Sequence, residues 1–329
     1  MNQFKDKISQ SSFLITGGAG FIGSNMVELL LSLGAKQVRV LDNLSNGYYS
    51  NIEGFVGLHN FEFVEGDIRD LETCKIAVDG MDYISHQAAL GSVPRSVEDP
   101  ITSNDVNIGG HLNMLVAAKE SPTLKRMVYA ASSSSFGDSK ELPKVEGNEG
   151  KPLSPYAVTK WVNELYGDVF SRVYGLHTVG LRYFNIFGPK QNPNNPYAAV
   201  IPLFMKAAME GTSPKINGDG TNSRDFTFVQ NALQANIKAM LDTEGLTQHE
   251  VVNIAVGDRT NLVALWDAIA SAAGTDVQPT FGPPRAGDIP HSLASIEKAK
   301  KLFSYDPKVK LKEGIEITFN WFKTEFNNQ

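Results

Sequence analysis

The chain reads Ser12-Phe13-Leu14-Ile15-Thr16-Gly17-Gly18-Ala19-Gly20-Phe21-Ile22-Gly23 near its start, an apolar run followed by a glycine-rich turn. Residues 12–15 have the length and composition of a buried parallel strand. After Gly23, apolar residues recur at helical spacing until Gly34. A strand that turns through glycines into a helix brings backbone N–H groups and the positive end of a helix dipole to one point. The segment therefore predicts a site for the pyrophosphate of a dinucleotide.

A second predicted strand, residues 38–41, ends at Asp42. In dinucleotide sites, an acidic residue at about this distance from the glycine turn binds the adenosine ribose. The Asp42 carboxylate would accept hydrogen bonds from both ribose hydroxyls and would repel a 2′-phosphate. The position therefore favours NAD over NADP as the cofactor.

Strands and helices alternate from residue 12 to about residue 187, which predicts an α/β fold with a doubly wound parallel sheet of the Rossmann type. The further predicted strands are residues 61–64, 83–86, 127–130 and 178–181. Polar side chains follow these strands, in the order Asp67, Gln87, Ser132 and Asn185. Because open parallel sheets bind ligands at the carboxyl ends of their strands, we expect these side chains to meet at one edge.

The composition changes after Phe187, where residues 188–196 are rich in Pro, Asn and Gly and predict a long loop. We expect residues 227–241 to return to the main sheet. The predicted dinucleotide-binding domain therefore comprises residues 1–187 and 225–251. A smaller, discontinuous C-terminal domain comprises residues 188–224 and 252–329, and we expect it to bind the substrate.

Charge and composition argue against several classes of function. The 329-residue chain has a net charge of −6, which disfavours a nucleic-acid or anionic-membrane surface. Cys74 is the only cysteine, so we expect no disulfide and no thiolate metal cluster, as in a reducing cytoplasm. The first residues lack the apolar core of a signal peptide, and no stretch approaches the length of a membrane span. The histidines, including His86 and His291, lack metal-ligand spacing, so we expect no metal site.

Tyr156 and Lys160 lie four residues apart in Tyr156-Ala157-Val158-Thr159-Lys160, so both side chains fall on one face of a helix. Such a pair by itself is more often an exposed surface pair. Together with the glycine turn and Ser132 at a strand end, it indicates a proton-transfer site beside a nicotinamide. A free tyrosine has a pKa near 10, so ionisation at neutral pH needs a shift of roughly 3 units. The Lys160 charge would supply part of that shift.

A set of motifs runs in a fixed order almost from end to end of the chain. Besides the glycine turn and Tyr156 to Lys160, the motifs are Gly66-Asp67-Ile68, His86-Gln87-Ala88-Ala89, Ala131-Ser132-Ser133-Ser134, Arg182-Tyr183-Phe184-Asn185, Tyr197-Ala198-Ala199-Val200-Ile201-Pro202, Asn217-Gly218-Asp219-Gly220, Arg224-Asp225-Phe226 and Arg285-Ala286-Gly287-Asp288. This set is similar to that of the extended short-chain dehydrogenase/reductase family, and within the family it resembles the bacterial UDP-N-acetylglucosamine 4-epimerases. Glycines 17, 20 and 23 have the spacing of this family, whereas 18, 20 and 23 have the general dinucleotide spacing.

The resemblance implies three catalytic residues. Tyr156 would be the base that removes a proton from the sugar 4-hydroxyl while C4 passes hydride to NAD. Lys160 would stabilise the phenolate and hydrogen-bond the nicotinamide ribose. Ser132 would hydrogen-bond the sugar 4-oxygen and help to pass the proton.

The resemblance also implies two sets of binding residues. The implied NAD-binding residues are Gly17, Gly20, Phe21, Ile22, Gly23, Asp42, Asn43, Ser45, Gly47, Asp67, Ile68, Gln87, Ala88, Ala89, Asn107, Tyr156, Lys160 and Tyr183. The implied UDP-sugar contacts are Ser92, Ser133 and Ser134 for the sugar, Asn185, Ala199 and Val200 for the diphosphate and uracil, Asn217 and Asp288 for the uridine, Arg224 and Arg285 for the diphosphate, and Ser292. The fork of a guanidinium suits phosphate oxygens, which supports the two arginines.

Two neighbours of Ser132 bear on the reaction. In the related sugar 4,6-dehydratases this tract carries Asp and Glu, whereas this chain has Ser133 and Ser134, which disfavours elimination of water. The resemblance therefore implies NAD-dependent 4-epimerisation of UDP-hexoses through a transient 4-keto sugar, foremost UDP-GlcNAc to UDP-GalNAc. Phe136 departs from the family, which usually has tyrosine there. The alternatives are a 4-epimerase of UDP-hexuronic acids (UDP-GlcNAcA or UDP-GlcA), another nucleotide-sugar dehydratase or decarboxylase, and a non-catalytic NAD-binding scaffold.

The resemblance places Ser292 in the wall of the sugar pocket, where relatives restricted to UDP-Glc and UDP-Gal tend to carry tyrosine. Serine would leave space for an N-acetyl group at C2, although it could instead be a loop hydroxyl that faces solvent. Relatives form dimers through the helix of Tyr156 and the preceding helix near residues 109–119, so we expect a homodimer. The aromatic side chains of Phe319, Trp321, Phe322 and Phe326 follow a helical pattern and predict core packing.

Overall fold

The computed structural model describes residues 2–242, 246, 248–284 and 290–327. Its centre is a seven-stranded sheet in the order β11-β6-β5-β4-β1-β2-β3, and every neighbouring pair of strands is parallel. The strands are β1 (Ser12–Thr16), β2 (Gln37–Asp42), β3 (Phe61–Glu65), β4 (Tyr83–His86), β5 (Arg126–Ser132), β6 (Thr178–Tyr183) and β11 (Glu250–Ile254). The direction of winding reverses between β1 and β4, the place where such sheets bind ligands. The predicted doubly wound α/β fold is confirmed.

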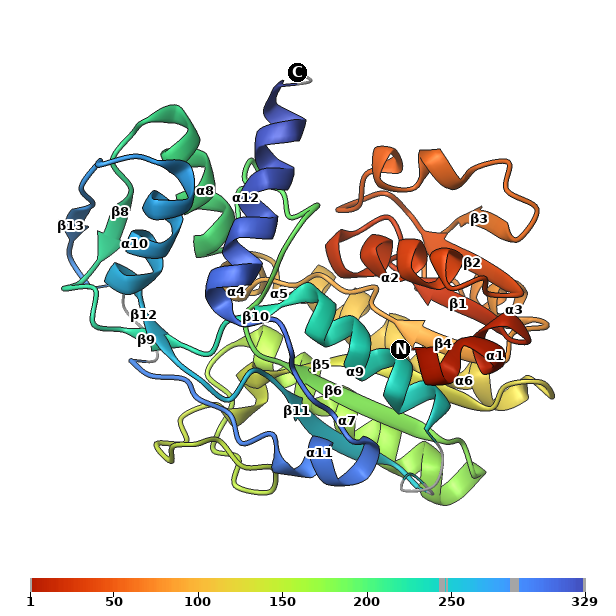
Figure 1. Cartoon of the computed structure of the whole chain (residues 1–329). Coiled ribbons are helices and arrows are strands. Elements are labelled where there is room, and N and C mark those ends of the chain that lie inside the picture. The colour runs from red at the N-terminus through yellow and green to blue at the C-terminus, as the bar shows by residue number, and fades with distance from the viewer. Residues whose placement is uncertain (1, 243–245, 247, 285–289, 328–329) are drawn as a thin grey trace.

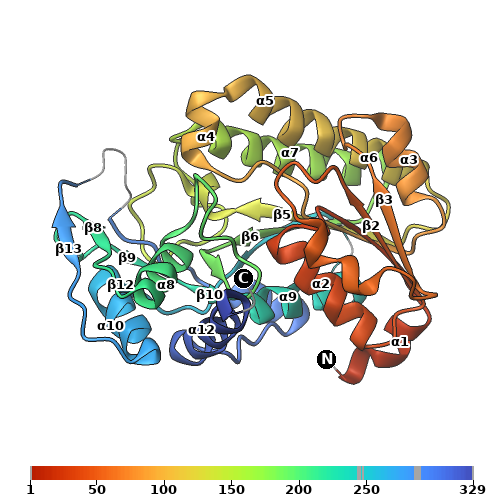
Figure 2. The same ribbon diagram turned by 90° about the horizontal axis from the view of Figure 1, so that it is seen from above.

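Helices cover both faces of the sheet (Figure 2). One face carries α3 (Leu71–Val78), α4 (Val93–Glu98), α5 (Pro100–Asn104), α6 (His111–Glu120) and α7 (Pro155–Tyr174), and a π-helical turn, Asp105–Gly110, joins α5 to α6. The other face carries α2 (Phe21–Ser32) and α9 (Val229–Leu241), with the short α1 (Lys5–Ser9) at one end. Because both faces are covered, β1 is buried at every residue, which explains its uniformly apolar sequence.

Local signals fix the ends of the two helices that matter most for the site. α2 follows Gly20, and the chain leaves it at Gly34, whose φ of +77° a side chain would strain. α7 begins after Ser154, whose hydroxyl accepts a hydrogen bond from the Ala157 N–H (3.1 Å), and its first residue is a proline. It ends at Gly175 in the left-handed conformation.

A smaller lobe lies beside the carboxyl edge of the sheet, at the left in Figure 1. It contains α8 (Val200–Glu210) and α10 (Leu262–Ala273). Two short sheets accompany them: β8 (Lys215–Asn217) pairs with β13 (Thr280–Gly282), and β9 (Ser223–Arg224) pairs with β12 (Thr260–Asn261). The last helix, α12 (Leu311–Asn327), packs against α8 and α10.

The chain crosses between the two lobes more often than the predicted boundaries state. Residues 188–199 form a loop without helix or strand, as predicted. β10 (Thr227–Phe228) pairs with β7 (Ile186–Phe187) rather than with the main sheet, although α9 after it packs on β4, β5 and β6. The predicted boundary at residue 251 falls inside β11, and α11 (Glu297–Phe303) packs on that strand. Residues 252–254 and 297–303 therefore lie with the large sheet.

The side chain of Asp225 links three of the segments that connect the two lobes through hydrogen bonds. Its buried carboxylate accepts hydrogen bonds from the N–H groups of Val256 (3.0 Å), Gly257 (3.1 Å) and Ala294 (3.3 Å). Burial raises the pKa of Asp225 to about 6, and these three donors oppose the rise. The aspartate of the Arg224-Asp225-Phe226 motif is thus a structural residue.

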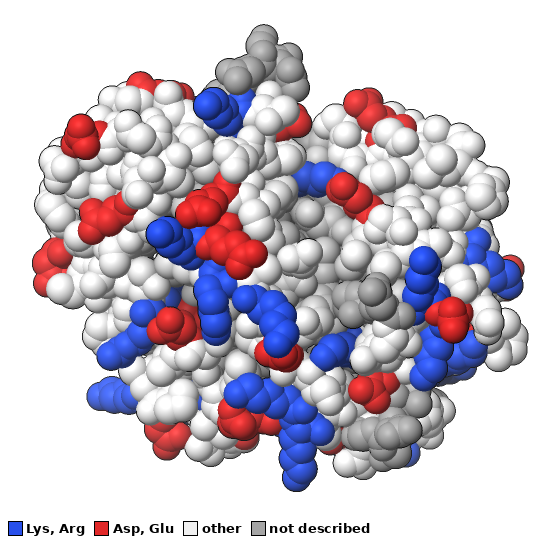
Figure 3. All heavy atoms as spheres, viewed as in Figure 1, with Lys and Arg blue, Asp and Glu red and all other residues white. Residues whose placement is uncertain are grey.

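The surface and the C-terminal helix add little that is specific to function. On the face shown in Figure 3, Lys and Arg side chains are interspersed with Asp and Glu. No helix within the described residues is long and apolar enough to cross a membrane. Phe319 and Phe322 of α12 are buried and Trp321 is half-buried, as the helical pattern predicted, whereas the side chain of Phe326 lies outside the described part.

Candidate active site

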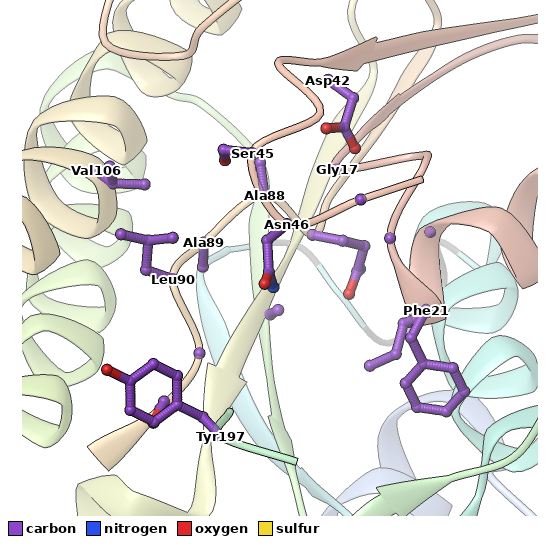
Figure 4. A pocket seen from close by; sticks show the side chains of 18 of the residues that line it. Gly17, Phe21, Asp42, Ser45, Asn46, Ala88, Ala89, Leu90, Val106 and Tyr197 are labelled. Atoms are coloured by element: carbon purple, nitrogen blue, oxygen red, sulfur yellow. The ribbon is translucent and has the colours of Figure 1, made fainter. Parts of the chain in front are cut away.

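A cavity of about 720 Å³ opens at the carboxyl ends of the parallel strands. The glycine turn, the segments after β2, β3, β4 and β5, the start of α7 and the loop 188–199 line it. In Figure 4, Gly17 and Asp42 lie at one end of the cavity and Tyr197 lies at the other. All predicted cofactor residues except Asn107 line this one cavity, as do Ser132, Tyr156 and Lys160.

The glycine turn leaves room only for backbone. Gly17 has a φ of +66°, and a Cβ there would come within 2.8 Å of the Ala88 nitrogen. A Cβ on Gly23 would overlap the carbonyl oxygen of Gly17. Gly17, Gly20 and Gly23 line the cavity, whereas Gly18 packs against Val40, so the 17-20-23 spacing is the one that faces the ligand space. The N–H groups of the first turn of α2 have no partners within the helix and lie at this wall, an arrangement that suits a pyrophosphate.

Asp42 holds the glycine turn in place and also faces the cavity. One carboxylate oxygen accepts the Ala19 N–H (2.9 Å), and the other accepts the Leu44 N–H (2.9 Å). Burial raises the pKa of Asp42, and both hydrogen bonds lower it. Each oxygen retains a lone pair, so a ribose hydroxyl in the cavity could still donate to this carboxylate.

Asp67 marks the side of the cavity that follows β3. Its carboxylate accepts hydrogen bonds from the Arg69 guanidinium (2.7 Å) and from the Asn43 amide (2.9 Å). The Arg69 hydrogen bond is the main reason that the pKa of Asp67 falls to about 2. Arg69 lines the cavity but was not predicted from the sequence, because an arginine beside an acidic motif has no distinctive spacing.

Two hydrogen bonds hold the backbone of Tyr156 in the first turn of α7. Its N–H donates to the buried Ser96 hydroxyl (3.0 Å), and Ser96 in turn donates to the Val93 carbonyl (2.8 Å). The Thr159 hydroxyl donates to the Tyr156 carbonyl (2.8 Å). These bonds join the start of α7 to α4, so the phenol enters the cavity from a fixed backbone.

Lys160 is buried one turn further along α7, and its ammonium donates to the Ala130 carbonyl at the end of β5 (2.8 Å). Burial lowers the pKa of Lys160 to about 8, which the Glu164 carboxylate opposes. Burial also raises the pKa of Tyr156, and the nearby Ser132 hydroxyl offsets this only in part. The ammonium lies against Ala130 and 5.9 Å from the centre of the Tyr156 ring, and burial outweighs any lowering of the Tyr156 pKa by its charge, so the partial contribution of Lys160 to a phenolate stays a prediction.

The hydrogen bonds of Ser132 fix the direction in which it donates. Its oxygen accepts both the N–H (3.1 Å) and the hydroxyl (2.8 Å) of Ser134. A hydroxyl oxygen has two lone pairs and one proton. With both lone pairs in use, the Ser132 proton is free to be donated toward Tyr156 or toward an oxygen of a bound substrate.

A closed network of amides and hydroxyls joins the half-buried Gln87 and Tyr183 in the cavity wall to the buried Ser85 and Asn236. Asn236 of α9 donates to the Tyr183 hydroxyl (2.7 Å), which donates to the Gln87 side-chain oxygen (3.2 Å). The Gln87 amide group then donates to Ser85 (2.9 Å) and to Asn236 (3.2 Å). Tyr183 and Gln87 were predicted from the sequence, whereas Asn236 and Ser85 were not, since only the packing of α9 on the sheet brings them together.

Asn107, predicted to contact the cofactor, does not line the cavity. Its side chain accepts the Leu90 N–H (2.8 Å) and donates to the Leu90 carbonyl (3.2 Å) and to Thr159 (3.2 Å). It therefore clamps the loop after β4 to α7, and this role replaces the predicted contact.

The predicted substrate residues divide into three groups. Those that line the cavity are Ser92, Ser133, Ser134, Asn185 and Ala199. Those that lie outside the cavity wall are Val200 at the start of α8, Asn217 in β8, Arg224 in β9, and Ser292, whose N–H donates to the Ser223 carbonyl (3.0 Å). Arg285 and Asp288 lie outside the described residues.

The loop 188–199 closes the cavity through polar contacts that sequence reasoning did not find. The Asn195 amide donates to the Asn46 side chain (3.1 Å), and the Asn192 amide donates to the Tyr48 hydroxyl. The Arg95 guanidinium lies 4.8 Å from the centre of the Tyr197 ring. The predicted long loop is thus a wall of the site. Within the described residues, no cluster of His, Cys, Asp and Glu could hold a metal ion.

Comparison with known proteins gives consistent matches over nearly the whole chain. The profile of the "NAD dependent epimerase/dehydratase family" matches residues 13–255. A protein of Methanocaldococcus jannaschii described as a putative UDP-glucose 4-epimerase is 36% identical over 312 residues, 94% of this chain and 98% of that protein.

Two solved structures are similar in fold and in sequence. A UDP-N-acetylglucosamine 4-epimerase from Methanobrevibacter ruminantium, in complex with UDP-N-acetylmuramic acid, has a TM-score of 0.90 and 36% identity over 96% of this chain and 99% of that chain. A UDP-glucose 4-epimerase from Thermotoga maritima, with UDP-glucose, has a TM-score of 0.89 and 34% identity over 96% of this chain and 99% of that chain.

The geometry of Asp42 leads to a test of cofactor choice. An asparagine has one oxygen and one NH₂ group, so Asp42→Asn leaves either the Ala19 or the Leu44 N–H facing a donor. We expect the free energy of unfolding to fall by about 1–3 kcal/mol. We also expect weaker NAD binding and a smaller preference for NAD over NADP, because the negative charge is gone. Titration of nucleotide-free protein with both cofactors, together with chemical denaturation, measures these effects.

The exposed Asp79→Asn variant is the matched control for this test, and it should change neither quantity. An unchanged preference between NAD and NADP in Asp42→Asn would contradict the role given to the Asp42 carboxylate.

Proposed function

The chain belongs to the NAD-dependent epimerase/dehydratase family and acts as an NAD-dependent UDP-sugar 4-epimerase, and we propose that its principal reaction interconverts UDP-GlcNAc and UDP-GalNAc. One observation above all supports this proposal. Ser132, Tyr156 and Lys160 all line the same cavity as the glycine turn. A proton donor, a phenol and a cation therefore lie beside the space in which a nicotinamide and a sugar would meet.

The residues present fit a bound NAD. Gly17 and Gly23 form a cradle that a Cβ would fill, and the start of α2 presents N–H groups to it. Asp42 and Asp67 provide carboxylates at the ends of β2 and β3. When bound, NAD accepts a hydride from C4 of the sugar and returns it to the opposite face, and its oxidised ring adds a positive charge near the phenol.

Tyr156 takes up and returns the proton of the sugar 4-hydroxyl in this proposal. Burial raises the pKa of Tyr156, which favours the neutral phenol. Nearby positive charge favours the phenolate, and Lys160 contributes one such charge. Ser132 donates its free proton toward the 4-oxygen, because Ser134 occupies both of its lone pairs. Because the proton and the hydride that leave the sugar would both be returned to it, the reaction would yield no net oxidation.

The serines that follow Ser132 favour epimerisation over dehydration. Removal of water from C5 and C6 needs an acid and a base near C6. Ser133 and Ser134 line the cavity at these positions, and neither carries a carboxyl group. Ser134 is also committed to Ser132 through its hydroxyl (2.8 Å).

The UDP part of the substrate is assigned to the side of the smaller lobe. Asn185 and Ala199 line the cavity there. Asn185 has a φ of +40°, and its amide donates to the Asp225 carbonyl (3.1 Å), which ties this wall to the Arg224-Asp225-Phe226 motif. Arg224 directly follows Ser223, whose carbonyl accepts a hydrogen bond from the Ser292 N–H, so the two residues lie close together. We assign Arg224 and Arg285 to the diphosphate, and the small Ser292 side chain to the space beside C2 of the sugar.

We also propose that the protein is a homodimer. The outer face of α7 carries five exposed apolar side chains at helical spacing: Val158, Trp161, Leu165, Val169 and Val173. Val97 of α4 and Ile101 of α5, beside α7, are exposed as well. A row of this kind on one layer of helices suits a second copy of the same face.

Incubation with a panel of nucleotide sugars tests the function directly. We expect UDP-GlcNAc and UDP-Glc to be converted to their C4 epimers without accumulation of free NADH. Conversion of UDP-GlcA or UDP-GlcNAcA alone would favour the uronic-acid reaction, and loss of water or of CO₂ would favour a dehydratase or decarboxylase. If the protein binds NAD but turns over no member of the panel, the result would indicate a non-catalytic NAD-binding scaffold.

The role of Tyr156 is tested by removal of one hydroxyl. Tyr156→Phe should lower kcat by at least about a hundredfold, the scale of a lost general base, while NAD remains bound. Tyr174→Phe makes the same change at the exposed end of the same helix and should leave kcat unchanged. Normal turnover in Tyr156→Phe would refute the proposed proton transfer.

The choice of sugar is tested at Ser292. A tyrosine there would fill the space assigned to the N-acetyl group, and overpacking of this kind costs about 1–3 kcal/mol. Ser292→Tyr should thus lower kcat/KM for UDP-GlcNAc and UDP-GalNAc by about fivefold to 150-fold while sparing UDP-Glc and UDP-Gal. Ser292→Ala should spare both classes of substrate. Equal losses on both classes in Ser292→Tyr, or none, would mean that Ser292 does not face the sugar.

A further inference from the structure

A buried set of charges continues along α7 beyond Tyr156 and Lys160. Glu164 lies one turn after Lys160 and is 5% exposed. Arg182 of β6, which is 3% exposed, holds it with two parallel hydrogen bonds: Nε donates to one carboxylate oxygen (2.8 Å) and Nη2 donates to the other (2.6 Å). The Ser135 hydroxyl also donates to the carboxylate (3.2 Å). The Glu164 carboxylate is therefore fixed in place.

Arg182 has a second carboxylate partner on its other side. Its Nη1 donates to Glu149, which also accepts the Gly147 N–H (3.0 Å). The guanidinium lies 4.8 Å from the centre of the Phe136 ring. This set thus contains two cations, Lys160 and Arg182, and two anions, Glu164 and Glu149, so its net charge is zero. Such a balance is required, because an unpaired buried charge is strongly unfavourable.

Of the titratable groups that the structure describes around Lys160, Glu164 is the one that supplies a negative charge. Tyr156 and Glu164 lie on its own helix, His86 lies on β4, His111 lies on α6, and Arg182 lies on β6. Burial lowers the pKa of His86 to about 3 and holds that of His111 well below its usual value, so both rings are neutral at pH 7. Among the described residues, the Lys160 ammonium makes one hydrogen bond, to the Ala130 carbonyl, and no ion pair.

We propose that Glu164 is a positioning residue for the reaction, and that its carboxylate, locked by Arg182, keeps Lys160 protonated beside Tyr156. This inference rests on the proposed function, since it assigns Glu164 a role through Lys160. Side chains four residues apart on a helix are neighbours, and both of these are buried, so the two charges interact with little screening by water. The Arg182 fork stops the carboxylate from turning toward solvent.

The sign of the effect follows from the charges. Burial favours the neutral amine of Lys160 and lowers its pKa to about 8, while Glu164 favours the ammonium and raises that pKa. Removal of the carboxylate lets burial act alone, so the pKa falls further. The ammonium is present below its pKa and is lost as the pH rises through it. The alkaline limb of the pH profile of kcat should therefore move to lower pH.

The experiment compares Glu164→Gln with two matched variants that remove the same kind of charge. Glu149→Gln takes the other carboxylate from Arg182, and Asp168→Asn removes an exposed carboxylate one turn further along α7. We expect Glu164→Gln to move the alkaline limb of kcat down by about one pH unit. We expect Glu149→Gln to lower stability without moving that limb, and Asp168→Asn to change neither.

A second measurement does not depend on turnover. The rate at which acetic anhydride modifies Lys160, followed by mass spectrometry as a function of pH, reports the pKa of the amine in the whole protein. This pKa should fall by the same amount in Glu164→Gln. If that variant does not fold, Glu164→Met combined with Arg182→Met replaces the buried pair by apolar side chains, which proteins often tolerate, and should lower the same pKa.

The outcomes separate the two proposals. Equal pKa values of Lys160 in the wild type and in folded Glu164→Gln, or an equal shift in Glu149→Gln, would overturn the role of Glu164. If the Lys160 pKa shifts in Glu164→Gln but the wild-type protein turns over no UDP-sugar, the charge interaction between Glu164 and Lys160 is supported and the epimerase function is refuted. The interaction would then have no catalytic role.

Discussion

The close approach of three backbone segments around Gly17 is the constraint on which the site depends. Gly17 donates to the Leu41 carbonyl (2.8 Å), lies against Ala88, and leaves its own carbonyl beside Gly23. A side chain at either glycine would force β1, α2 and the loop after β4 apart. The same contact determines where α2 begins and therefore where its N–H groups point. The dinucleotide wall is thus built by backbone geometry, and side chains such as Asp42 reinforce it.

The catalytic wall depends on buried polar groups instead. Ser96 ties the first turn of α7 to α4, Asn107 ties it to the loop after β4, and Ser134 fixes the direction of the Ser132 proton. Burial strengthens the hydrogen bonds of these groups, and it also raises the free-energy cost of leaving any of them unpaired. It holds the pKa of Tyr156 above and that of Lys160 below their usual values. Burial alone therefore favours the neutral forms of both side chains, so their charged forms depend on nearby groups of opposite charge.

The two lobes contribute different sets of residues to the proposed site. The glycine turn and the residues assigned to proton transfer all stand at the edge of the large parallel sheet. The loop 188–199 and the crossing strands bring in Asn185, Ala199, Arg224 and Ser292 from the side of the smaller lobe. Asp225 joins these segments to the end of β11. Under the proposed function, changes in the second set would alter the substrate while the first set would keep the chemistry.

The sequence by itself determined the parts that depend on local pattern. Apolar runs of strand length, the glycine turn and the spacing from Tyr156 to Lys160 identified the parallel sheet and indicated a site with Asp42, Ser132, Tyr156 and Lys160 at its carboxyl edge, because each of these signals lies within a few residues. Tertiary structure decided what depends on contacts between distant segments. It alone showed that Asn107 clamps Leu90, that Asn236 orders Gln87 and Tyr183, and that Glu164 and Arg182 meet beneath Lys160. These contacts join residues from 17 to 149 positions apart, and no local spacing records them.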